Sequence, residues 1–240
     1  MFAALANPHR FMAFSRWAAP TLGVLAAALG LAGLVFAFAA PEDYQQGDTV
    51  RIMFVHVPAA WMSMAVYGAM GVASFLYLIF RHSLADAAAK AAAPLGAAFT
   101  GLALVTGSLW GQPMWGTWWV WDARLTSVLV LFLLYLGYIA LRASMDDEAK
   151  AGRAAAILAL IGLVNLPVIK FSVDWWNTLH QGASSFRMAG GSALAGVYQT
   201  PLYLMGLAYL AAFGALWLVR IRGEVFRRRA QSLAMQAAGA

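Results

Sequence analysis

Long apolar stretches alternate with short polar segments along the whole chain. Six stretches carry almost no charged residues, and they lie at about residues 20–40, 54–80, 92–110, 125–142, 154–171 and 201–220. A helix needs roughly 20 apolar residues to cross the ~30 Å of hydrocarbon in a bilayer. The pattern therefore predicts an all-α integral membrane protein with six transmembrane helices, organised as one polytopic membrane domain over residues 1–240.

The composition excludes a soluble globular protein, because 62% of the residues are hydrophobic, 11% are charged, and the mean hydropathy is +0.70. The first apolar stretch could be a signal peptide, since Ala37-Phe38-Ala39 has the small-x-small pattern of a cleavage site. However, its apolar run exceeds the roughly 7–15 residues of a signal-peptide core. We expect a retained membrane anchor.

The distribution of basic residues predicts the orientation. If the N-terminus is cytoplasmic, the inner segments hold most of the sixteen Lys and Arg residues, namely Arg10, Arg16, Arg81, Lys90, Arg142, Lys150, Arg153, Arg220, Arg222, Arg227, Arg228 and Arg229. By the positive-inside rule, both termini are then cytoplasmic. The net charge of +6 indicates contact with anionic lipid through a basic tail and is poor evidence for nucleic-acid binding. A bilayer is the partner that the charge predicts.

The segment at about 110–124 is a predicted outer loop that carries five of the ten tryptophans within twelve residues: Trp110, Trp115, Trp118, Trp119 and Trp121. Trp is a large rigid surface with one N–H donor, so five of them beside glycine and proline predict a flat aromatic platform. Such a platform suits a planar, mostly apolar ligand that carries some charge. The alternative is an interfacial aromatic belt, which needs only scattered Trp and Tyr near helix ends.

The chain has no cysteine, which excludes disulfides, thiolate metal sites and the thioether attachment of haem. A metal would have to be held by His, Met or carboxylate. His9 and His82 lie among basic residues on the predicted cytoplasmic side, and we expect them to be ordinary surface residues.

His56 and His180 lie on the predicted outer side, on the same side as the Trp cluster. Trp176 and His180 are four residues apart in a predicted short helix that Gly182 ends, so they would share one face. Either histidine alone could be an ordinary interfacial residue. Two of them beside the Trp cluster favour bis-imidazole ligation of haem iron, as in a non-covalently held haem b.

Arg51 and Arg124 supply cationic groups near this predicted site, and an Arg fork can pair with a haem propionate. Arg124 lies at the start of the fourth apolar span, where a charge without a partner is costly. The alternative for Arg124 is a local salt bridge with Asp122.

The motif WGTWWVWDARLT, at residues 115–126, resembles the signature of the tryptophan-rich (WWD) haem-handling proteins. Three longer segments, APEDYQQGDTVRIMFVHVPAAWMSM, APLGAAFTGLALVTGSLWGQPMWG and NLPVIKFSVDWWNTLHQG, are similar to the haem exporter protein C family of the bacterial (System I) cytochrome c maturation machinery. The resemblance covers most of residues 40–182. The haem lyases that share the Trp motif are far longer.

The resemblance implies a protein of the bacterial inner membrane that holds haem at the periplasmic face and presents it to a membrane-anchored haem chaperone. It also implies a pair of ABC transporter subunits and a small single-span protein as partners. By this similarity, His56 and His180 would be the axial ligands, and the five tryptophans with Asp122, Arg124, Arg51 and Trp176 would form the haem site. Asp43, Gln46 and Arg51 match the family's chaperone-facing positions.

Two other functions remain open from the sequence. A b-type haem quinol oxidoreductase subunit would also bind haem between helices, but it typically places His pairs inside its spans, and the third to sixth stretches contain no His. A non-haem scaffold of an ABC transporter complex would need neither the His pair nor the Trp cluster. Ser184 and Ser185 lack a nucleophile relay with His180, so we expect a haem transport protein and not an enzyme.

Overall fold

The computed structural model describes residues 7–180 and 194–238, and it is all-helical apart from short connections. The helices run in the order α2 (Pro8–Ala39), the 3₁₀ helix η1 (Asp48–Ile52), α3 (Met53–Phe80), α4 (Ser83–Trp115), α5 (Ala123–Ser144), α6 (Glu148–Gly162), α7 (Asn165–Trp175) and α8 (Gly196–Ala238). Six segments are long and apolar enough to cross a membrane, with η1–α3 and α6–α7 each forming one of them. The predicted all-helical class and six apolar spans are confirmed.

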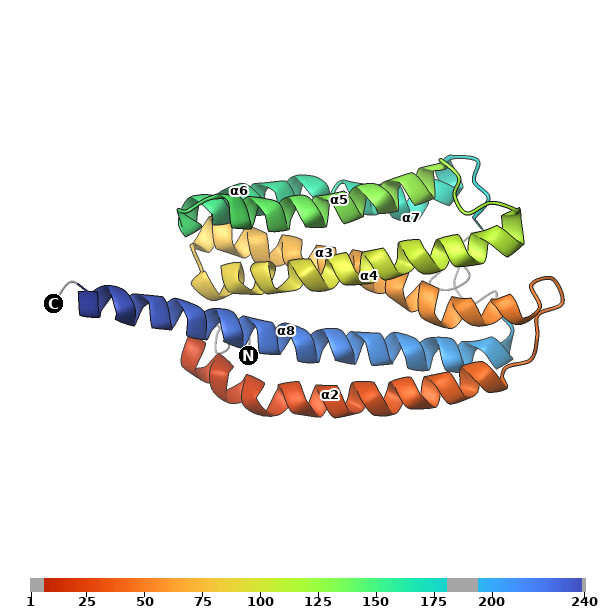
Figure 1. The fold of residues 1–240 in the computed structure, drawn as a ribbon, viewed down its shortest axis with the longest axis horizontal. Helices are drawn as coiled ribbons and strands as arrows, with labels where there is room; N and C mark the ends of the chain where they lie inside the picture. Colours follow the sequence, from red (N-terminus) through yellow and green to blue (C-terminus); the bar gives the residue numbers. More distant parts are fainter. Residues whose placement is uncertain (1–6, 181–193, 239–240) are drawn as a thin grey trace.

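The helices lie side by side along one direction in three groups (Figure 1). α2 packs along α8 on one side, α3 and α4 form the centre, and α5 with α6 and α7 forms the other side. α3 and α4 also contact α8, so the centre is covered from both sides. The long C-terminal part of α8 extends past the other helices (Figure 1).

Three helices are longer than the apolar stretches predict. α2 begins at Pro8, where the Asn7 side chain accepts a hydrogen bond from the His9 N–H at 2.9 Å. α4 begins at Ser83, nine residues earlier than expected, because an alanine-rich segment has high helix propensity and its buried Asp86 is neutralised by basic partners. α8 continues through the basic tail to Ala238.

The fifth span is broken into α6 and α7, although the sequence predicts one continuous helix. Pro167 has no N–H to donate to the Leu163 carbonyl four residues earlier, and its ring would clash with that carbonyl. The chain instead makes a 3₁₀-type bond from the Leu166 N–H to the Leu163 carbonyl at 3.1 Å. The Asn165 amide donates to the Ser127 carbonyl at 2.8 Å, which fixes the break against α5.

Tyrosines and small residues form the centre of the bundle. Tyr67 and Tyr135 are fully buried with ring centroids 5.0 Å apart, and the Tyr135 hydroxyl donates to the Ser63 carbonyl at 2.8 Å. Gly96 on α4 and Gly162 on α6 leave the space that these two side chains occupy. Small residues at helix contacts allow the close approach that packing inside a membrane requires.

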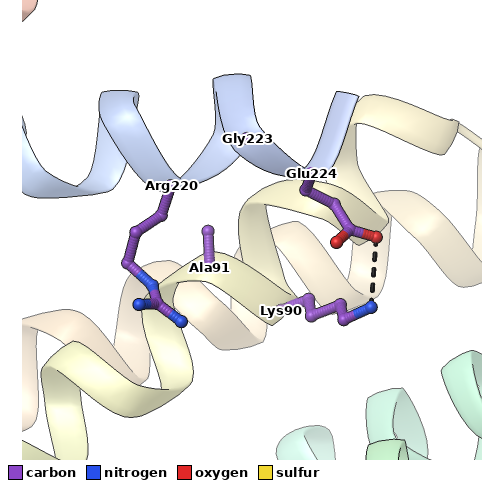
Figure 2. Close-up of a pocket in the computed structure, with 5 residues that line it drawn as sticks. All are labelled: Lys90, Ala91, Arg220, Gly223 and Glu224. Carbon is purple, nitrogen blue, oxygen red and sulfur yellow. Dashed lines mark hydrogen bonds and ion pairs between the residues drawn. The ribbon is translucent and has the colours of Figure 1, made fainter. Parts of the chain in front are cut away.

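An ion-pair network joins α4, α5, α6 and α8 at one end of the bundle. The buried Asp86 carboxylate accepts from Arg142 at 2.6 Å and from Arg228 at 2.5 Å. Glu224 binds Lys90 at 3.1 Å and Arg228 at 2.8 Å. Figure 2 shows the Lys90–Glu224 pair at a pocket of about 270 Å³ between α4 and α8. Here the hydrogen-bonding capacity of the charged groups is largely met within the protein.

The two ends of the bundle differ in chemistry. The twelve basic residues predicted to be cytoplasmic lie on the first part of α2, near the α3–α4 and α5–α6 connections, and on the last part of α8. These four segments lie at the same end of the bundle (Figure 1). We call this the basic end. The loop between α2 and η1, the α4–α5 connection and the end of α7 lie at the opposite end, which we call the Trp-rich end (Figure 1).

Gly96→Ala should destabilise the bundle, because the added Cβ would overlap the ring of the buried Tyr135. Overpacking of this kind costs about 1–3 kcal/mol. Gly101→Ala on the same helix is the matched control, since its Cβ would meet Phe132 at an ordinary 3.5 Å and the change favours helix by about 0.5–1 kcal/mol. Thermal unfolding in detergent measures both, and equal melting temperatures for the two variants would contradict this account of the core.

Candidate functional site

A tight turn at residues 41–47, which we call the first loop, begins the Trp-rich end. The Asp43 carboxylate accepts hydrogen bonds from the backbone N–H groups of Gln45 at 2.9 Å and Gln46 at 3.0 Å. The backbones of Asp43 and Gly47 bond to each other, and Gly47 has a φ of 54°, which favours glycine. Asp43, predicted to contact a partner, therefore also shapes this loop, while Tyr44 at its tip is 91% exposed.

Gln46 connects the first loop to the Trp cluster. The Trp110 indole N–H donates to the Gln46 side-chain oxygen at 3.0 Å. The Trp110 ring lies 5.7 Å from the His56 ring, with an angle of 72° between the planes. The first loop is therefore linked through one indole to one of the two predicted ligands.

His56 lies in the first turn of α3, at the predicted mouth of the second span. Its Nδ1 is 3.1 Å from the Thr106 hydroxyl oxygen on α4. Gly107 lies against the same imidazole, and a Cβ there would be 3.0 Å from the His56 Cε1. The α4 surface therefore holds one side of the ring and leaves Nε2 outside the Thr106 contact.

The Trp-rich connection begins where α4 ends at Trp115. Gly116 takes a left-handed conformation with φ of 74°, and its N–H donates to the Gln112 carbonyl at 3.0 Å. The Trp115 ring lies against Gly111, where an added Cβ would be 3.0 Å from the ring, so a larger residue at position 111 would obstruct this contact. The Trp115 indole lies 4.9 Å from the His180 ring. Each predicted ligand thus contacts one tryptophan edge-on.

The five indoles do not form the flat platform that the sequence analysis describes. The Trp119 and Trp121 rings meet at 76°, so they cannot lie in one plane. Trp118 and Trp121 are 58% and 77% exposed, whereas Trp110 and Trp115 are half-buried against the histidines. The cluster therefore has an inner pair beside the imidazoles and an outer pair at the surface. The half-buried Trp119 has an indole N–H without a partner among the described residues.

Asp122 joins three segments of the site. Its carboxylate accepts from the Leu125 N–H at 2.7 Å and so caps α5, and it also accepts from the Thr178 hydroxyl. The same carboxylate lies 3.4 Å from the His180 Nδ1. Burial alone would raise the pKa of Asp122, but the bonds from Thr178 and Leu125 hold the pKa below its ordinary value. The group is therefore a carboxylate at neutral pH.

His180 follows α7 without forming part of a helix. α7 ends at Trp175, and Trp176 is extended with φ of −134°, so the predicted short helix that would place Trp176 and His180 on one face is wrong for residues 176–180. Gly182, its predicted end, lies outside the described residues. Burial lowers the pKa of His180 and the nearby Asp122 offsets part of that effect, so the imidazole is neutral and able to ligate a metal.

Trp176 is half exposed and packs against Trp175, with ring centroids 5.7 Å apart. No described ring contact joins Trp176 to His180.

Arg124 bonds to the C-terminal half of α7 and does not pair with Asp122. Its Nε donates to the Ser172 hydroxyl at 3.1 Å, and its Nη2 donates to the backbone carbonyls of Ile169 and Lys170, both at 3.3 Å. The ion pairs among the described residues do not include Arg124 with Asp122. Two Nη1 hydrogens remain without a partner in this part of the chain, so the residue can serve both structure and an anionic ligand.

Arg51 bonds to its own 3₁₀ helix and to the end of α2. Its guanidinium pairs with Asp48 one turn away in η1 and donates to the Ala40 carbonyl at 3.2 Å. Arg51, which is predicted to bind a propionate and to contact a partner, therefore also makes bonds within the protein.

The candidate site therefore contains two imidazoles from separate elements within electrostatic range of each other and of Arg124. Sequence reasoning missed three hydroxyl residues that contact the predicted site residues, namely Thr106, Thr178 and Ser172. Hydroxyl side chains at these spacings carry no distinctive signal in the sequence. No group of three or more His, Asp and Glu that could hold a bare metal ion occurs among the described residues.

Comparison with known proteins gives a consistent identification. A family model described as Heme exporter protein C matches residues 1–236. Heme exporter protein C of Bradyrhizobium diazoefficiens is 58% identical over 234 residues, covering 98% of this chain and 89% of the relative. The Escherichia coli (strain K12) protein of that name is 49% identical over 222 residues, covering 92% and 89%.

A ccmC-like mitochondrial protein of Marchantia polymorpha, whose name refers to cytochrome c biosynthesis, is 42% identical over 236 residues and is covered along its full length. The family model covers nearly the whole chain, and the matched range contains the six apolar segments and positions 56 and 180. The chain therefore belongs to the Heme exporter protein C family, whose members are membrane proteins that handle haem for the biogenesis of c-type cytochromes.

Proposed function

We propose that this protein holds haem b non-covalently at the periplasmic face of the bacterial inner membrane and delivers it to a membrane-anchored haem chaperone. The observation that carries the proposal is the convergence of His56 from α3 and His180 from the segment after α7, each beside one inner tryptophan. Neutral imidazoles are common axial ligands of haem iron. Haem is the cargo of this site.

The remaining residues of the site suit the rest of the haem molecule. The Trp110 and Trp115 indoles flank the two imidazoles and offer apolar contact to the macrocycle. The Trp119 indole N–H, which has no partner in the part of the chain that the structure describes, and the Arg124 Nη1 group are donors for the propionates. Together these groups match both the apolar face and the anionic edge of haem.

Delivery requires a surface that a second protein can reach. Three aromatic side chains are largely exposed at the Trp-rich end: Tyr44 in the first loop, and Trp118 and Trp121 in the α4–α5 connection. We propose that the chaperone docks there, and that two ABC transporter subunits and a small single-span protein complete the assembly. Binding and handing over haem needs ligand exchange only, so we propose no enzymatic step.

We propose that the Trp-rich end faces the periplasm and that both termini lie in the cytoplasm. Because the chain has no cysteine, single-cysteine variants report accessibility without background. Tyr44→Cys at the exposed loop tip should react with a membrane-impermeant maleimide in intact spheroplasts, and Gln231→Cys on the exposed end of α8 should react only after permeabilisation. The reverse labelling pattern would invert the proposed topology.

His56→Ala or His180→Ala should remove much of the bound haem, and the double variant should retain almost none, because each supplies one of two axial ligands. Added imidazole should restore a six-coordinate absorption spectrum in either single variant. His9→Ala, on the exposed start of α2 at the basic end, is the matched control and should bind haem like the wild type.

If the double variant keeps its haem content and absorption spectrum, His56 and His180 are not the ligands of the haem iron. A wild-type protein purified without haem would support the scaffold function instead. Haem that cycles readily with quinol would support the oxidoreductase function.

Gln46→Leu should weaken haem retention as well as transfer, because it removes the hydrogen bond that holds Trp110 beside His56. One neutral hydrogen bond contributes about 0.5–1.5 kcal/mol, so retention should fall by up to about tenfold. Tyr44→Ala, at the exposed tip of the same loop, should leave retention intact and reduce only covalent haem on the chaperone. If both variants load the chaperone at the wild-type rate, the docking surface lies elsewhere.

A further inference from the structure

The two imidazoles of the site have different hydrogen-bond partners. His56 Nδ1 contacts a neutral hydroxyl, that of Thr106, at 3.1 Å. His180 Nδ1 faces a carboxylate, that of Asp122, at 3.4 Å. The partner on the second ring nitrogen sets which nitrogen is free for a metal and how strongly that nitrogen donates.

The hydrogen bonds of Thr106 fix the direction of its contact with His56. A hydroxyl has one hydrogen, and the Thr106 hydroxyl is 2.7 Å from the Leu102 carbonyl, which can only accept. The Thr106 oxygen must then accept from His56, so the proton sits on Nδ1 and Nε2 carries the free lone pair. Thr106 therefore presents the His56 Nε2 for ligation.

Asp122 acts on His180 in the same direction but with a full charge. A carboxylate only accepts, so His180 Nδ1 must donate and Nε2 is again free. The same carboxylate is held in place by the Leu125 N–H and the Thr178 hydroxyl, and the His180 N–H donates to that hydroxyl oxygen at 3.1 Å. A carboxylate partner makes an imidazole a stronger metal ligand than a hydroxyl partner does.

Resting on the proposed function, we propose that Thr106 and Asp122 are positioning residues that make the two axial ligands unequal: His180 is the retained strong ligand, and His56 is the weaker ligand that leaves the iron first during handover. The placement of the two rings agrees with this order. His56 is the ligand that Trp110 and Gln46 connect to the first loop, where a docking partner would act. Arg124 interacts electrostatically with both rings, so it does not account for the difference.

The variants that test this are Thr106→Val, Thr106→Ser and Asp122→Asn, each compared with wild type after loading with hemin in detergent. Thr106→Val keeps the side-chain shape and removes the acceptor, whereas Thr106→Ser keeps the hydroxyl and is the matched control. Asp122→Asn can still cap α5 through its amide oxygen but removes the charge and offers an N–H donor to the imidazole. Thermal unfolding of the haem-free proteins checks that all variants are folded.

Thr106→Val should lose haem about tenfold to a hundredfold faster than wild type, as typical for loss of a partner behind a ligating His. Thr106→Ser should be close to wild type. Asp122→Asn should raise the midpoint potential of bound haem, because the weaker His180 donor stabilises the ferric state less, and it should do so by more than Thr106→Val.

Cyanide identifies the ligand that leaves. If cyanide replaces His56, its complex retains His180, so the absorption spectrum of that complex should shift in Asp122→Asn and stay constant in Thr106→Val. The binding rate should rise in Thr106→Val, since departure of His56 limits the reaction.

The opposite pattern, with the cyanide complex shifted only in Thr106→Val, would overturn the proposal by showing that His180 leaves first. Wild-type spectra and haem-loss rates in both Thr106→Val and Asp122→Asn would overturn it and leave the proposed function standing. A wild type that shows no six-coordinate haem spectrum would overturn the proposed function as well.

Discussion

The Asp122 carboxylate accepts hydrogen bonds from the first turn of α5 and from Thr178, and it faces the His180 imidazole. One side chain thus begins a membrane-spanning helix and positions the irregular segment that follows α7. Backbone outside a helix must find other hydrogen-bond partners near the hydrocarbon. Here the His180 N–H donates to the Thr178 hydroxyl, and that hydroxyl donates to Asp122 at the start of α5. Arg124, two residues further on, bonds the Ile169 and Lys170 carbonyls within α7. The geometry around His180 therefore depends on the pairing of α5 with α7.

The basic end has a different physical role. Its buried carboxylates are paired with arginines and a lysine from other helices, so charges that would be costly alone are neutralised within the bundle. Asp86 on α4 receives Arg142 from α5 and Arg228 from α8, which ties together helices from the centre and both sides of the bundle. At the Trp-rich end, the Trp119 indole N–H and the Arg124 Nη1 group have no partner among residues 7–180 and 194–238. The charges of the basic end are thus largely paired within the protein, although Arg142 Nε has no partner among the described residues.

Much of the fold could be predicted because hydrocarbon imposes a simple requirement of length and apolarity. The starts of α2 and α4 could not, since Asp86 reads as a surface residue until its partners from α5 and α8 are known. The break before α7 has a local cause in Pro167 and was open to prediction. The two histidines and the Trp cluster stood out by residue type, whereas Thr106 and Thr178 gain meaning only from contacts about 50 residues away in sequence. The prediction that the Trp cluster forms a flat platform was wrong, because composition carries no information on the angles between rings.

Under the proposed function, the site must bind haem firmly enough to collect it and loosely enough to give it away. The structure divides these requirements between two supports. His180 stands on a loop fixed by a buried carboxylate, whereas His56 stands on a helix beside Trp110, whose indole is bonded to the first loop. A partner that displaces Gln46 would remove the bond that orients Trp110, and Trp110 is the ring that confines His56. Docking and release are thereby linked through three side chains, with no movement of a membrane-spanning helix required.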